Sequence, residues 1–117
     1  MLKVPRENSI SFSLSLTNAD GTPITKEDFP NASVIFTVKK DWRDSTPAVI
    51  HKVIPMSQMS DDNVIAIALS SSDTNIEPGT YLYDIAVDAG TEFFTVVYDH
   101  QHGYPDKFIV MPTISRK

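Results

Sequence analysis

Cysteine is absent from the 117-residue chain. This absence excludes disulfide bonds, thiolate metal sites and a cysteine nucleophile together. Glycine occurs only four times and never as a pair, so no glycine-rich phosphate loop is present. The abundant serines include no Gly-x-Ser-x-Gly elbow of the kind that activates a nucleophilic hydroxyl. We therefore expect a protein that is not an enzyme and that needs no cofactor.

Positive charge is also scarce, because ten lysines and arginines stand against fifteen aspartates and glutamates, a net charge of −5. Nucleic-acid binding needs a basic footprint, and anionic bilayers attract basic segments. We therefore expect neither nucleic acid nor membrane as a partner. No apolar run approaches the ~20 residues of a membrane span. Residues 1–10 contain no apolar h-region, so we expect no secretory signal.

Period-two alternation of apolar and polar residues dominates the rest of the sequence. In segment 9–16, four apolar side chains alternate with four serines, so one face is apolar and the other polar. A helix would scatter the apolar set around its circumference, so this segment is predicted to be a half-buried strand.

Further strands are expected wherever the same alternation, or a short β-branched run, lies between turn-forming residues. These segments are 33–40, 48–54, 64–69, 80–87, 91–98 and 107–114. The run at 64–69 is apolar throughout and is expected to be a central strand. Seven or eight short strands without a helix longer than one turn predict an all-β sandwich, formed as a single domain over residues 1–117.

The stretch "LSSSDTNIEPGTYLYDI", residues 69–85, combines a loop with the start of a strand. Ser70 or Ser71, together with Asp73, is expected to cap a single helical turn. Pro78 and Gly79 fit the two central positions of a type II turn, because proline presets φ and glycine supplies a positive φ. The chain is thereby predicted to cross from one sheet to the other.

Two tyrosines follow this turn on the apolar face of the predicted strand, Tyr81 and Tyr83. Either could form a tyrosine corner, with its ring buried and its hydroxyl bonded to the backbone a few residues upstream. Asp84 lies on the opposite face and is interpreted as a solvated or locally paired carboxylate rather than a general base. The predicted structural corner therefore consists of Pro78, Gly79, Tyr81 and Tyr83.

Trp42 is the single tryptophan and lies among charged residues. One interpretation is that its ring caps the edge of the core, which is the one we prefer from the sequence. The other is that Trp42 anchors an interface or stacks on a sugar.

The loop from Tyr98 to Tyr104 contains the most distinctive cluster of polar side chains in the sequence, which includes His100 and His102. Two histidines at i and i+2 of an extended segment point the same way and could share a metal ion. A metal site needs further ligands and a second shell, so we expect no metal and prefer a solvated loop that contacts a partner. The candidate interface residues are therefore Trp42, Tyr98, His100, His102 and Tyr104.

Four segments of the chain resemble motifs of a known protein family, and they follow one another in the same order as in that family. They are "FSLSLTNADGTPI" at 12–24, "VIFTVK" at 34–39, "IALSSSDTNIEPGTYLYDI" at 67–85 and "FIVMPTISR" at 108–116. Together they resemble a module common in tail and baseplate-region proteins of tailed bacteriophages and prophages. The family has a short hairpin and a glycine before its final strand, whereas this chain has the longer "YDHQHGYPD" at 98–106.

The resemblance implies an immunoglobulin-like antiparallel β-sandwich of about seven to eight strands. It further implies a non-enzymatic virion component, assembled in the bacterial host cytoplasm, that mediates protein–protein assembly in the tail or baseplate. Its partners would be other tail or baseplate proteins and further copies of itself. The alternative is a carbohydrate-binding or adhesion β-sandwich module that uses Trp42, Tyr98 and Tyr104 as stacking surfaces.

Overall fold

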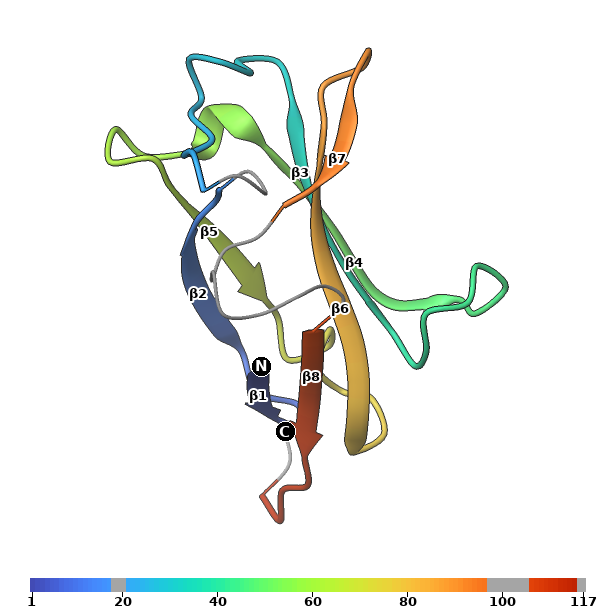
Figure 1. Cartoon of the computed structure of the whole chain (residues 1–117). Coiled ribbons are helices and arrows are strands. Elements are labelled where there is room, and N and C mark those ends of the chain that lie inside the picture. Colours follow the sequence, from blue (N-terminus) through green and yellow to red (C-terminus); the bar gives the residue numbers. More distant parts are fainter. Residues whose placement is uncertain (18–20, 97–105, 116–117) are drawn as a thin grey trace.

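The computed structural model describes residues 1–17, 21–96 and 106–115. Within these residues the chain forms eight strands and one short 3-10 helix, so the all-β prediction is confirmed (Figure 1). The elements are β1 (Leu2–Pro5), β2 (Ile10–Ser15), β3 (Ser33–Lys39), β4 (Ala48–Pro55), η1 (Met56–Gln58), β5 (Val64–Leu69), β6 (Gly79–Asp88), β7 (Phe93–Thr95) and β8 (Asp106–Met111). No helix in the described part of the chain is long and apolar enough to cross a membrane.

Two sheets make up the fold. The larger has the strand order β1-β8-β6-β3-β4, with β7 added beside β6, and the smaller consists of β2 and β5. Every pairing is antiparallel except that between β1 and β8, which is parallel. The arrangement is therefore antiparallel except at this edge, where the first strand lies beside the last (Figure 1).

The prediction that residues 64–69 form a central strand is wrong, because β5 pairs only with β2 in the described structure. Its apolar composition has a simple cause. Ile65 and Ile67 are buried, while the alternate positions Ala66 and Ala68 are exposed and carry only a methyl group. The central strand is instead β6, which pairs with β3, β7 and β8.

The hydrophobic core lies between the two sheets and is organised around Phe36 of β3, which is fully buried. Its ring lies 5.6 Å from that of Phe12 on the smaller sheet and 5.6 Å from that of Tyr83 on β6, measured between centroids. Phe108 of β8 adds an edge-to-face contact at 6.1 Å. This aromatic cluster joins both sheets, so it contributes specific geometry as well as buried apolar area.

The connection between β5 and β6 begins with the predicted single capped turn. The amide of Ser70 donates to the Asp73 carboxylate (2.8 Å), and the amide of Asp73 donates back to the Ser70 hydroxyl (3.2 Å). The Asp73 carboxylate also forms an ion pair with Lys52 of β4, in which Nζ lies 2.8 Å from Oδ2. The turn is thereby tied to the edge strand of the larger sheet.

The connection ends at the corner that leads into β6. The φ of Gly79 is +152°, whereas a type II turn needs about +80° at this position, so the type II prediction is wrong. Tyr81 has the geometry of a tyrosine corner, because its buried ring places the hydroxyl 2.6 Å from the carbonyl oxygen of Glu77. Tyr83 instead packs within the aromatic cluster, and Lys40 Nζ lies 4.6 Å from the centre of the Tyr81 ring.

Candidate functional site

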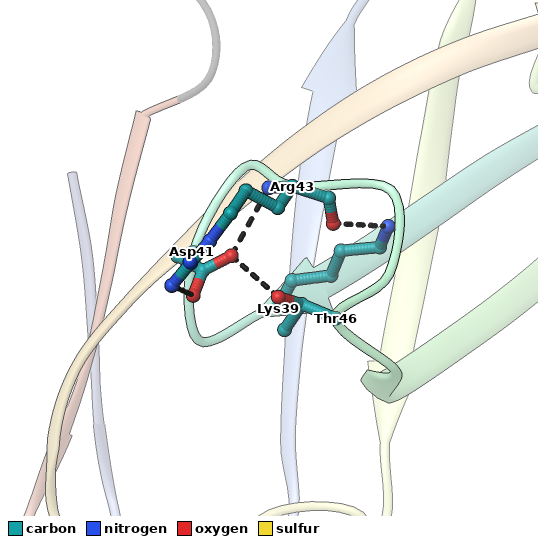
Figure 2. Close-up of polar contacts among 4 residues, drawn as sticks. All are labelled: Lys39, Asp41, Arg43 and Thr46. Atoms are coloured by element: carbon teal, nitrogen blue, oxygen red, sulfur yellow. Dashed lines mark hydrogen bonds and ion pairs between the residues drawn. The ribbon is translucent and has the colours of Figure 1, made fainter.

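The loop that joins β3 to β4 is organised around the carboxylate of Asp41. One oxygen accepts the backbone amide of Arg43 (3.0 Å) and the hydroxyl of Thr46, and the other accepts the Arg43 guanidinium (2.9 Å) (Figure 2). Lys39 Nζ closes the base of the loop by donating to the Arg43 carbonyl at 3.4 Å. The hydrogen bonds from Arg43 and Thr46 hold the pKa of the Asp41 carboxyl well below its usual value. The loop is therefore braced by its own side chains.

Trp42 lies between Asp41 and Arg43 and is 75% exposed. The interpretation that its ring caps the core is wrong. The reason is local: the β3–β4 register shifts between Val38 and Lys39, and the chain then leaves the sheet. Figure 1 shows this hairpin projecting from the body of the molecule. Tryptophan is among the more buried residue types on average, so its exposure on a braced loop keeps Trp42 as a candidate contact residue.

A cavity of about 240 Å³ lies beside this loop, on the outer face of the larger sheet. Two strands and the loop form its walls. The lining residues are Thr37 and Lys39 of β3, Leu82, Tyr83 and Asp84 of β6, and Asp41, Trp42 and Asp44 of the loop. Trp42 and Asp84 therefore line the same cavity. The sequence had left the role of Asp84 open.

Asp84 is half-buried in this cavity, so it is not fully solvated, and its charged neighbour Lys39 fits the alternative of a locally paired carboxylate. Strand register places it opposite Thr37, and Thr37 opposite His51 on β4. The Thr37 hydroxyl and His51 Nδ1 are 3.3 Å apart. Burial raises the pKa of the Asp84 carboxyl, and the positive charge of Lys39 opposes that rise. Any group that brings positive charge or hydrogen-bond donors to Asp84 would offset the cost of its burial.

The chemistry of the lining is that of a binding site with an excess of acceptors. Asp44 and Asp84 are carboxylates, and the ammonium of Lys39 is already directed at a backbone carbonyl. Leu82 adds an apolar wall and Trp42 an aromatic one. The arrangement is suited to hold a donor-rich group.

The other predicted interface residues lie outside the described part of the chain. They are Tyr98, His100, His102 and Tyr104, so the interface and metal predictions for this loop stay predictions. Among the described residues, no group of three or more histidines, aspartates and glutamates gathers where it could hold a metal ion.

The sequence did not single out Thr37, Lys39, Asp44 or Leu82 as site residues. A weak signal was available, because Thr37 and Lys39 share the outer face of one strand, and Leu82 and Asp84 share that of another. Alternation alone does not say which strands are neighbours. No family model and no curated protein matches the chain.

Proposed function

We propose that the protein is a non-enzymatic structural component of a phage or prophage tail or baseplate and that it mediates protein–protein assembly. The observation that carries the proposal is the exposure of Trp42 on a loop braced by Asp41. Tryptophan offers a large contact area at a low cost in conformational entropy, and it is enriched among the residues that dominate binding energy.

The edge strand next to the loop supports the same function. In the described residues β4 pairs with β3 alone, so its other side presents unpaired backbone groups. Val49 and Val53 on this strand are 39% and 54% exposed. A partner strand could add to such an edge through backbone hydrogen bonds, while apolar side chains such as Val53 add contact area. Copies of the chain that associate in this way would form a symmetric multimer.

The assignment of the fold as immunoglobulin-like is part of the proposal. Its support is the Tyr81 hydroxyl bonded upstream of β6, together with a small sheet of β2 and β5 that packs on a larger one. These features accompany the immunoglobulin-like sandwich. The four ordered sequence segments that resemble the tail and baseplate module give the proposal its virion context.

The assembly function is tested by size-exclusion chromatography with light scattering on the purified protein, and by capture of tail or baseplate proteins co-expressed with it. We expect self-association or a specific complex, either of which Val53→Asp weakens. Ile114→Asp is the matched control, because Ile114 is fully exposed and lies away from β4 in the sequence. A strict monomer that binds no tail or baseplate protein would contradict the proposal.

A carbohydrate-binding or adhesion module is the second candidate, and the exposed ring of Trp42 favours it. Sugars stack on exposed aromatic rings and accept or donate hydrogen bonds at the ring edge. Titration of the single tryptophan's fluorescence with glycans tests this alternative. A saturable shift with one sugar would favour it over assembly, and a flat response across the panel would remove it.

A further inference from the structure

The cavity beside Trp42 is short of hydrogen-bond donors. Asp41 already accepts three hydrogen bonds from Arg43 and Thr46, and the ammonium of Lys39 donates to the Arg43 carbonyl. The carboxylates that remain are Asp44, which is exposed, and Asp84, which is half-buried. Arg43 neutralises Asp41, so the charges left in the lining are the carboxylates of Asp44 and Asp84 and the ammonium of Lys39. The lining therefore has a net negative charge. An occupant that brings donors and positive charge would match this excess.

The apolar walls restrict the shape of that occupant. Trp42 and Leu82 flank the carboxylates, so a flat cation on an aliphatic stem would meet an aromatic surface and an aliphatic one. A cation near the face of an indole ring is attracted by the ring quadrupole. The volume of about 240 Å³ falls below the roughly 300–1,000 Å³ typical of small-molecule sites. It suits a single side chain better than an oligosaccharide.

We propose that this cavity receives an arginine side chain of a partner protein, with the guanidinium bonded to Asp84 and Asp44 and lying against Trp42. Arginine fits better than lysine, because its planar group offers five donors and stacks on aromatic rings, whereas an ammonium is a compact point charge. The net charge of −5 favours a basic partner surface at longer range. The inference rests on the proposed assembly function, because it names the chemistry of the partner's contact.

Two short blocked peptides test the proposal on the full chain, labelled with ¹⁵N for amide spectra. One is acetyl-Gly-Arg-Gly-amide, and the other replaces arginine with citrulline, which keeps the shape and removes the charge. We expect the arginine peptide to shift the amides of Thr37, Leu82 and Asp84 saturably and to change Trp42 fluorescence. The citrulline peptide should bind about tenfold more weakly, since hydrogen bonds to charged groups are the stronger ones.

Charge-neutralising variants locate the contact. Asp84→Asn should weaken binding of the arginine peptide about tenfold, and Asp44→Asn should weaken it by a smaller factor because its carboxylate is exposed. Asp62→Asn is the matched control, since it removes the same charge from an exposed loop outside the cavity and should leave binding unchanged. If Asp84→Asn does not fold, weaker binding of the arginine peptide by Asp44→Asn than by Asp62→Asn still tests the contact.

Several results would overturn the assignment. These are equal binding of the two peptides, equal binding by the Asp84 and Asp62 variants, or shifts at the same amides with glucose, galactose or N-acetylglucosamine but not with arginine. Self-association without any response to the arginine peptide would retain the assembly function and reject the arginine site. Arginine binding by a strict monomer that captures no tail protein would support the site and count against the assembly function.

Discussion

Asp84 of β6 lies directly opposite Thr37 of β3, on the outer face of the larger sheet. This pairing places a half-buried carboxylate beside the loop that carries the exposed Trp42, within one cavity. Burial raises the pKa of Asp84, so its negative charge is unfavourable in the free protein. Positive charge or hydrogen-bond donors brought to Asp84 would offset the cost of its burial.

Neutralising Asp84 should stabilise the free protein at neutral pH. A carboxyl whose folded pKa is raised contributes stability below its unfolded pKa of about 3.9 and loses it as the pH rises through the folded value. Asp84→Asn should therefore be more stable than the parent at pH 7, with a smaller gain at pH 4. Urea unfolding at the two pH values measures this. An equal loss of stability at both would contradict the account.

Removing the Tyr81 hydroxyl should destabilise the corner that leads into β6. The hydroxyl donates to the Glu77 carbonyl at 2.6 Å, and the ring is 4% exposed. Tyr81→Phe leaves that carbonyl without this donor, at a cost of about 1–1.5 kcal/mol, whereas Tyr81→Ala also removes the ring and should cost about 3–5 kcal/mol. Chemical denaturation gives both values. If Tyr81→Phe has no effect, the bond does not stabilise the corner.

The ion pair between Lys52 and Asp73 should contribute stability that depends on pH. Burial acts to raise the pKa of Asp73, but hydrogen bonds from Lys52 and Ser70 outweigh it and lower the pKa below its usual value. Its contribution is therefore present above the unfolded pKa of about 3.9 and is lost as the pH falls through the lowered folded value. The acid limb of the stability profile of the parent should be steeper than that of Asp73→Asn.

Substitutions separate the two roles of Asp73. Asp73→Ala removes both the cap and the ion pair and should cost about 1–2 kcal/mol. Lys52→Met removes only the ion pair, which is partly exposed at 35% and 21% for its two side chains, and should cost less than about 1 kcal/mol. Equal losses in thermal unfolding would mean that the cap contributes nothing.

Truncating Phe36 should be as damaging as truncating Tyr81, because the Phe36 ring contacts Phe12, Tyr83 and Phe108 across both sheets. Phe36→Ala is expected to cost about 3–5 kcal/mol. Phe93→Ala is the matched control, because Phe93 is 66% exposed and should change stability by less than about 0.5 kcal/mol. Comparable losses for the two variants would contradict the placement of the core.

The strands were predictable because alternation is a local property. Segment 9–16 and the faces of Tyr81 and Tyr83 follow from spacing alone. The cavity was not predictable, since alternation assigns Thr37 and Asp84 to outer faces without stating that the two strands are neighbours. The prediction that Trp42 caps the core failed for a related reason. The β3–β4 register shifts after Val38 and the loop then leaves the sheet, and no local sequence pattern predicts this. Alanine at 66 and 68 likewise made an edge strand resemble a central one.

The central proposal is that Trp42 becomes buried when the protein assembles, and fluorescence of this single tryptophan tests it most directly. In the free chain its side chain is 75% exposed, so emission should be that of a solvated indole, readily quenched by acrylamide. As the protein associates with itself or with a tail or baseplate partner, we predict a blue shift and loss of quenching, with Trp42→Ala weakening the complex. An indole that stays solvated and quenchable in every complex would contradict the proposal.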